Sequence, residues 1–184
     1  KGRCNVTNAC DIREFMRHVP RNPKFLYSSL TAFPPSDVMA FFENLGVPLK
    51  IERGNRVFPV SDNANDIADA LDRWQRGQGA RLLRNRVLSV ERDDTGAVCG
   101  VATDKGFIPC KAVILCTGGA SYPGTGSTGD GYAMARGLGH GIIEPAPSLV
   151  PLESPDEFCA ELSGFSPRNV RVSVTEDGKV IYQE

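Results

Sequence analysis

The spacing of apolar residues predicts several amphipathic helices. Apolar positions recur every three or four residues over 24–32, 36–45, 65–78 and 129–138, as on the buried face of a helix. A shorter helix is expected over 9–18, with Asn8 as its N-cap. The inner face of the helix at 36–45 is expected to consist of Val38, Phe41, Phe42 and Leu45. The inner face of the helix at 65–78 is expected to consist of Ile67, Leu71 and Trp74.

Short alternating runs predict β-structure between and after these helices. Strands are expected at 49–52 and 56–60, and a β-meander is expected from runs at 81–85, 87–92, 98–103 and 107–108. Runs at 170–175 and 179–182 flank Asp177-Gly178, which predicts a hairpin. Four prolines within 144–155 indicate a crossing between domains. We therefore predict one domain over 1–147 and the start of a second, β-rich domain over 148–184.

The most informative stretch runs from 111 to 140. An unbroken apolar run ends abruptly at Thr117-Gly118-Gly119, and a loop of Gly, Ser and Thr then leads into the last predicted helix. Such a run is typical of a parallel strand covered on both faces, and ligands of doubly wound sheets bind at the carboxyl ends of these strands. Glycines there let a ligand approach the main chain. The pattern predicts a buried strand, 111–116, that ends at a nucleotide cofactor; a glycine-rich connection without a ligand is the alternative.

Gly124, Gly126 and Gly129 match the spacing G-x-G-x-x-G, but their position argues against a dinucleotide fingerprint. In that fingerprint the first glycine closes the strand, whereas six residues separate Thr117 from Gly124 here. Asp130 at the helix start suits the helix dipole but would repel a bound phosphate. We interpret the loop as lying along the uncharged part of a cofactor.

Composition and charge narrow the range of partners. The chain has 184 residues, 41% of them hydrophobic and 23% charged, with a net charge of −1. This balance gives no electrostatic reason to expect a nucleic acid or an anionic membrane surface. No apolar stretch approaches spanning length and no signal peptide opens the chain. We expect a cytoplasmic protein with a small-molecule substrate and with no nucleic-acid or membrane partner.

The cysteines and histidines favour neither a disulfide framework nor a metal site. The six cysteines include no C-x-x-C pair, so reduced thiols are expected, with Cys116 inside the buried strand. His18 and His140 are far apart in sequence. The chain begins with Lys1 rather than Met and ends within a predicted strand, so we expect it to be the middle of a longer protein.

Three segments together resemble the BaiN/YhiN-like family of NAD(P)/FAD-dependent oxidoreductases. They cover residues 2–8, 54–61 and 117–131 and read GRCNVTN, GNRVFPVS and TGGASYPGTGSTGDG. The resemblance implies an α/β fold in which 1–147 is a partial, Rossmann-like FAD-binding domain with helices and a β-meander. It also implies that a first βαβ unit, which would carry the FAD pyrophosphate, precedes Lys1, and that the β-rich domain is an insertion.

The same resemblance implies a set of cofactor contacts. Those residues are Gly2, Arg3, Cys4, Asn5, Thr7, Val87, Thr117, Gly118, Gly119, Tyr122, Gly126 and Asp130. Arg3 could supply a fixed charge, and Asn5 and Thr7 could bond ribityl or phosphate oxygens. The alternative is that Thr7 and Asn8 only cap a helix and Arg3 is solvated.

Individual members of this set keep their own alternatives. Val87 resembles a position whose backbone meets the adenine ring, although an ordinary strand valine fits the pattern as well. Tyr122 could stack near the isoalloxazine or could be a packed surface ring. Cys4 is expected to be an unreactive thiol, because no C-x-x-C partner accompanies it. The catalytic residue is unknown.

Two functional hypotheses follow. In the first, FAD relays hydride from NAD(P)H to a small unsaturated or conjugated carbonyl substrate, with the protein supplying orientation and polarity. In the second, the chain is a non-catalytic structural fragment or interaction module that does not bind FAD alone and that pairs with partners through the hairpin edge at 180–182. The sequence leaves the oligomeric state open.

Overall fold

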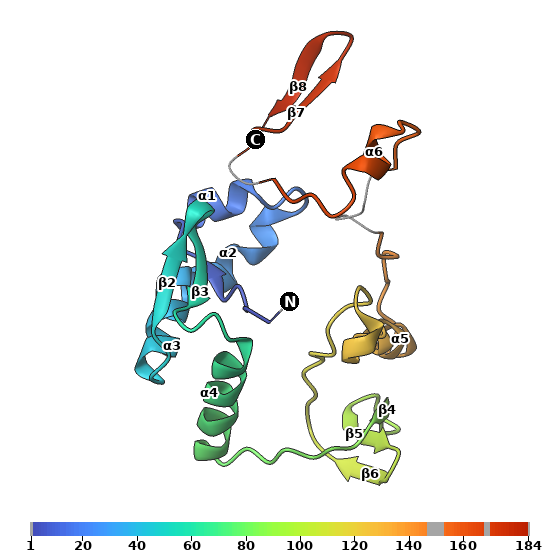
Figure 1. The fold of residues 1–184 in the computed structure, drawn as a ribbon. Helices are drawn as coiled ribbons and strands as arrows, with labels where there is room; N and C mark the ends of the chain where they lie inside the picture. The colour runs from blue at the N-terminus through green and yellow to red at the C-terminus, as the bar shows by residue number, and fades with distance from the viewer. Residues whose placement is uncertain (1, 147–152, 168–169, 184) are drawn as a thin grey trace. The chain divides into compact units, whose positions relative to one another are not determined.

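The computed structural model describes residues 2–146, 153–167 and 170–183 (Figure 1). The chain divides into two compact units, Lys1–Asn85 and Arg86–Glu184, which are considered separately below. Helices and three small sheets make up both units, and every strand pairing among the described residues is antiparallel.

Unit 1 contains four helices, close to the predicted ones. They are α1 (Ile12–Arg17), α2 (Pro23–Ala32), α3 (Pro35–Asn44) and α4 (Ala64–Gly77). The prediction that Asn8 caps the first helix is wrong. Asp11 is the cap and accepts a 2.8 Å hydrogen bond from the Glu14 amide, while Asn8 belongs to a strand and accepts from the Cys10 amide. Because this local turn occupies Cys10, α1 begins later than expected.

A three-stranded sheet packs beside these helices in the order β1-β3-β2. The strands are β1 (Thr7–Asn8), β2 (Leu49–Glu52) and β3 (Arg56–Pro59), so both predicted strands in this region are confirmed. The connection between β2 and β3 is the 3-10 turn η1 (Arg53–Asn55), in which Gly54 takes a φ of 73°. Val57 in the central strand is completely buried.

The core of unit 1 lies between α3 and α4. Its buried members are Phe42, Val47, Ile67 and Ala70. The predicted inner face of α4 is partly wrong, since Leu71 and Trp74 keep 40% and 43% of their surface exposed. The buried stripe is narrower than predicted because the small Ala70 fits against the core, leaving Trp74 at its margin with its ring edge-on to Phe41 at 5.2 Å.

Unit 2 opens with the predicted β-meander. Its strands, in the order β4-β5-β6, are β4 (Val87–Arg92), β5 (Val98–Thr103) and β6 (Gly106–Pro109). Gly100 in the central strand is buried, and a Cβ atom there would lie 2.2 Å from Cζ of Phe107. The strand predicted at 81–85 does not form, because no described strand pairs with that segment.

The buried strand predicted at 111–116 is the main error of the sequence interpretation. This segment pairs with no described strand, Ile114 is 87% exposed and Cys116 is exposed. An apolar run supplies side chains suited to a sheet interior, but a strand forms only where a neighbouring strand accepts and donates its backbone hydrogen bonds.

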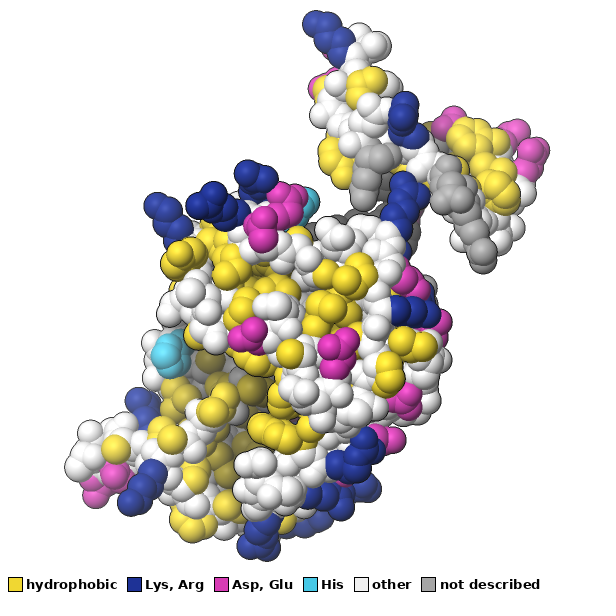
Figure 2. Space-filling view, turned by 90° about the vertical axis from the view of Figure 1, so that its left-hand side faces the viewer, with side chains coloured by type: hydrophobic (Ala, Val, Ile, Leu, Met, Phe, Trp, Pro, Cys, Tyr) yellow, Lys and Arg dark blue, Asp and Glu magenta, His cyan; other side chains and the backbone are white. Residues whose placement is uncertain are grey.

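The remaining predicted elements of unit 2 are present. Helix α5 (Asp130–Gly137) follows the glycine-rich loop, and the hairpin consists of β7 (Ser173–Glu176) and β8 (Lys179–Gln183). A short helix, α6 (Phe158–Glu161), was not predicted. Part of the proline-rich crossing lies outside the described residues. Many large apolar side chains among the described residues are exposed, among them Phe158, Phe165 and Ile181. Figure 2 shows hydrophobic side chains on the surface of the face that it presents.

Candidate functional site

The corner at Gly118 and Gly119 exposes main chain rather than side chains. Gly118 is exposed and takes a φ of 73°, a conformation that L side chains rarely adopt, while Gly119 is half-buried. The Gly119 carbonyl accepts a 3.2 Å hydrogen bond from the Gly129 amide, so the loop closes back on the start of α5. The corner is therefore a bare backbone surface held by the helix that follows it.

The rest of the loop forms a turn of its own between the corner and the start of α5. A 3-10 turn, η2 (Pro123–Thr125), follows Tyr122, and Gly126 ends it with a φ of 88°. The Tyr122 carbonyl accepts from the Thr125 amide at 3.0 Å and from its hydroxyl at 2.8 Å, and the Tyr122 side chain is 69% exposed. The loop thus contains a separate turn instead of the single tight bend of a dinucleotide fingerprint.

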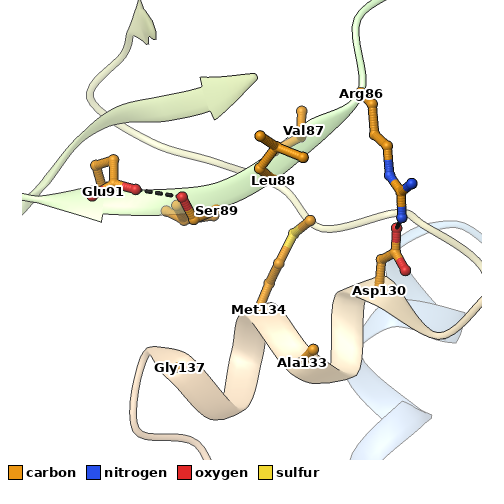
Figure 3. A pocket seen from close by; sticks show the side chains of 10 residues that line it. Arg86, Val87, Leu88, Ser89, Glu91, Asp130, Ala133, Met134 and Gly137 are labelled. Atoms are coloured by element: carbon orange, nitrogen blue, oxygen red, sulfur yellow. Dashed lines mark hydrogen bonds and ion pairs between the residues drawn. The ribbon is translucent and has the colours of Figure 1, made fainter. Parts of the chain in front are cut away.

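A pocket of about 480 Å³ lies between β4 and α5 (Figure 3). Val87, half-buried, lines it from the strand, and Asp130, Ala133 and Met134 line it from the helix. Figure 3 shows the Met134 side chain reaching from the helix toward the strand. The structure therefore brings together two residues of the predicted cofactor set, Val87 and Asp130.

Asp130 is held by two neighbours at the mouth of this pocket. Its Oδ1 accepts a hydrogen bond from the Thr128 hydroxyl at 2.8 Å, and its Oδ2 accepts from Arg86 Nη2 at 3.1 Å. The Thr128 hydrogen bond and then the Arg86 guanidinium lower the pKa of Asp130 below its ordinary range. Sequence reasoning missed Arg86, because a partner 44 residues away leaves no local signal.

In unit 1, the predicted segment 2–8 runs beside the sheet and does not cap a helix. The Val6 amide donates to the Val57 carbonyl at 2.8 Å, Thr7 pairs with Val57 in β1, and the Asn8 side-chain amide donates to the Gly54 carbonyl at 2.8 Å. The first two family-like segments, 2–8 and 54–61, are therefore neighbours. The third segment belongs to unit 2.

Arg3 lies among carboxylates. Its Nε donates to Asp62 Oδ1 at 2.9 Å, its Nη2 donates to the same oxygen and to Glu52, and its guanidinium stands 4.2 Å above the Phe58 ring. Lys50 also reaches Asp62, at 2.7 Å. The charge of Arg3 is thus matched within the protein, and the two carboxylates raise its pKa further above the ordinary value.

The other predicted residues of this segment have backbone features of their own. Gly2 takes a φ of 88° and its carbonyl accepts from the Ala64 amide at 2.7 Å. Cys4, a non-glycine residue, takes a φ of 56°, which is uncommon and marks a sharp change of direction. Asn5 is exposed.

Other sites were sought over the whole described chain. A second pocket, of about 700 Å³, lies by the starts of α1 and α3 and includes Cys10, whose pKa is raised by burial. All six cysteines are free. Within 2–146, 153–167 and 170–183, no three His, Cys, Asp or Glu side chains gather as a metal-ligand set. No helix among those residues combines the length and apolar character that crossing a membrane requires.

Comparisons with known proteins extend these observations. Residues 1–178 match the family described as "HI0933-like protein Rossmann domain". A 3-dehydro-bile acid delta(4,6)-reductase of Clostridium scindens is 31% identical over 89% of this chain and 39% of its own length. A ribosomal RNA dihydrouridine synthase of Escherichia coli is 28% identical over 100% of this chain and 45% of its own length. A ribosomal RNA dihydrouridine synthase of Haemophilus influenzae is 31% identical over 90% and 42%.

The chain therefore spans less than half the length of these curated relatives. Among solved structures, an open conformation of a flavocytochrome c3 fumarate reductase covers 75% of this chain and 33% of its own, with 21% identity and a TM-score of 0.45. The expected α/β, Rossmann-like fold class is confirmed by the family match together with the mixed helices and sheets.

Proposed function

Because the chain belongs to the HI0933-like protein Rossmann domain family, we propose that it forms part of the FAD site of a flavin-dependent oxidoreductase. The observation that carries this proposal is the exposed main chain at Gly118 and Gly119, closed onto the start of α5 by the hydrogen bond from Gly129 to Gly119. A flat or polar cofactor can lie against such a surface without meeting a Cβ atom.

The residues of unit 2 fit a flavin nucleotide at two places. The pocket at Val87 has the volume of an ordinary small-molecule site, which is about 300–1,000 Å³, and combines apolar walls with strand backbone. Asp130 at the helix start disfavours a phosphate, so the loop suits the uncharged ribityl or ring portion. Gly118, Gly119, Thr117, Tyr122 and Gly126 would lie along that portion.

The residues of unit 1 fit the cofactor less directly. Arg3 Nε and Nη2 are directed at Asp62 and Glu52, so Arg3 would shape the site through this network rather than pair with a phosphate. Gly2, Cys4, Asn5 and Thr7 would offer backbone groups and small polar side chains to a flavin. The bound flavin would supply hydride transfer, while the chain would bind and orient it.

The substrate class is suggested by chemistry that the relatives' names share, and the nicotinamide donor by the family resemblance described in the sequence analysis. Reduction of a bile-acid double bond and formation of dihydrouridine both saturate a carbon–carbon double bond that is conjugated with a carbonyl group. We therefore propose NAD(P)H as donor and a conjugated carbonyl compound as substrate. The expected exclusion of nucleic acid stays a prediction, since two relatives are named for an RNA product.

Domain boundaries and location remain parts of the proposal. Residues 1–147 would belong to the flavin-binding domain and 148–184 would begin an inserted β-rich domain, although the two compact units meet at Asn85 and Arg86. A cytoplasmic location fits NAD(P)H as donor.

Flavin titration tests this function. The chain and the complete protein encoded by its gene are titrated with FAD, and the holoprotein is then mixed with NAD(P)H in the absence of oxygen. We expect tight binding in the complete protein and bleaching of the flavin absorbance by NAD(P)H. A complete protein that is colourless and takes up no FAD would refute the proposal and leave the interaction module as the explanation.

Substrate class is tested by giving the reduced holoprotein two compounds in parallel. One is a steroid acid with a conjugated enone, and the other is a uridine-containing ribosomal RNA fragment. Reoxidation of the flavin by the steroid alone would support the small-molecule assignment. Reoxidation by the RNA alone would overturn both that assignment and the exclusion of nucleic acid.

A further inference from the structure

The two carboxylate oxygens of Asp130 serve two different parts of unit 2. Oδ1 accepts from the Thr128 hydroxyl within the glycine-rich loop, and Oδ2 accepts from Arg86 Nη2 at the start of β4. Figure 3 shows the Arg86 side chain running down from the strand to the first turn of α5. Asp130 therefore joins the loop to the meander.

Arg86 starts from a fixed point. Its amide donates to Asp104 Oδ1 at 2.9 Å, and its carbonyl accepts from the Asp104 amide at 3.0 Å. Asp104 belongs to the turn between β5 and β6, so the backbone of Arg86 is anchored to the meander on both sides of its side chain. A guanidinium on such an anchor restricts where its partner can lie.

On the helix side, Asp130 follows directly after the residue that holds the corner. The Gly129 amide donates to the Gly119 carbonyl, and the Tyr132 amide donates to the Gly129 carbonyl at 3.0 Å. A displacement of Asp130 therefore moves Gly129, and with it the bond that closes the Gly118–Gly119 corner.

We infer that Arg86 is a positioning residue, which holds the Gly118–Gly119 corner beside the Val87 pocket by pairing with Asp130. Arg86 also lines the pocket, but the inferred effect on the corner passes through Asp130. The cofactor part of this inference rests on the proposed function, whereas the effect on the loop does not.

Amide hydrogen exchange tests the effect on the loop without any ligand. In the flavin-free complete protein, Arg86→Gln should speed exchange of the amides of 118–132 about two- to fivefold, the range expected for so exposed an ion pair. Arg86→Lys keeps the charge and should restore part of the protection. Arg92→Gln, at the other end of β4, is the matched control and should leave these amides unchanged.

A double-mutant cycle tests the route of the effect. Arg86→Gln should weaken FAD binding by about the same two- to fivefold, measured by flavin fluorescence. In an Asp130→Asn background the same substitution should have no further effect, because its partner is already lost. Equal losses in both backgrounds would show that Arg86 acts independently of Asp130.

The outcomes separate the inference from the proposed function. If wild-type protein binds no FAD, the proposed function fails and the exchange data alone decide the role of Arg86. If FAD binds but Arg86→Gln changes neither exchange nor affinity, the inference is overturned. An undiminished loss of affinity in the Asp130→Asn background would also overturn it, because Arg86 would then contact the ligand directly.

Discussion

Thr117 packs against Gly131 so closely that the helix can carry no side chain there. A Cβ atom on Gly131 would lie 2.2 Å from Thr117 Oγ1 and 3.5 Å from its Cβ. The first turn of α5 therefore lies directly against the residue that precedes the glycine corner.

The contact predicts the effect of replacing Gly131. The clash in Gly131→Ala should destabilise unit 2 by about 1–3 kcal/mol, the usual range for overpacking. Alanine is more favourable than glycine within a helix by roughly 0.5–1 kcal/mol, and this gain offsets part of the loss. Thermal unfolding followed by circular dichroism measures the change. Adding Thr117→Ala removes the clashing hydroxyl and should recover most of the loss; no recovery would mean that other atoms resist the added carbon.

Gly118 and Gly124 form a matched pair for testing the backbone surface. Gly118 has a φ of 73° and a Cβ there would lie 3.0 Å from Ser127 Oγ, whereas Gly124 has open space around it and no such φ. Gly118→Ala should therefore weaken FAD binding about tenfold, since left-handed backbone costs an L residue about 1–2 kcal/mol. Gly124→Ala should bind as wild type. Equal affinities for all three proteins would contradict the placement of the cofactor at this corner.

The core of unit 1 offers a second matched pair. Phe42 is 7% exposed and Phe25 is 84% exposed. Phe42→Ala should lower the free energy of unfolding by about 3–5 kcal/mol, as expected for a buried aromatic side chain, and Phe25→Ala should change it by less than about 0.5 kcal/mol. Urea unfolding followed by fluorescence of Trp74, the single tryptophan, reports on this unit. Similar losses in both variants would show that Phe42 is not in the core.

The carboxylates around Arg3 predict an acid dependence of stability. The hydrogen bond from Arg3 lowers the pKa of Glu52 below its ordinary 4.5, and hydrogen bonds from Lys50 and then Arg3 lower the pKa of Asp62 below its ordinary 3.8. Because the folded pKa values are the lower ones, these groups stabilise the fold fully above the ordinary values. That stabilisation disappears as the pH falls through the folded values.

Unfolding of unit 1 in urea between pH 7 and pH 2 measures this dependence. Glu52→Gln should lower stability at pH 7 and should flatten the decline below about pH 4.5. Glu43→Gln, on the exposed side of α3, is the control and should leave the shape of the curve unchanged. A Glu52→Gln curve parallel to that of wild type would show that Arg3 adds no pH-dependent stability.

Local sequence patterns predicted the elements whose partners lie close in the chain. Residues 87–109 alternate around short turns, and they form the meander because each strand finds its partner within a few residues. The face of α3 with Phe41 and Phe42 also follows from helical spacing, and Gly46 ends that helix as expected.

Patterns failed where the deciding partner was distant or lacking. The apolar run at 112–116 resembles a buried strand, but no described strand pairs with it and Ile114 faces outward. The Arg86–Asp130 pair joins two polar residues that carry no shared local motif. Ala70 is buried while Trp74, four residues later on the same helix, stays 43% exposed, because periodicity assigns residues to a face but does not say how deeply each one is buried.

The exposed side chain of Ile114 also affects how long the polypeptide lasts inside a cell. Chaperones and proteases act on chains that display apolar segments, so a polypeptide with 87% of this isoleucine in water invites capture and degradation. A segment or partner that covers Ile114 should therefore lengthen the half-life of the chain. Expression without such a cover should first give inclusion bodies.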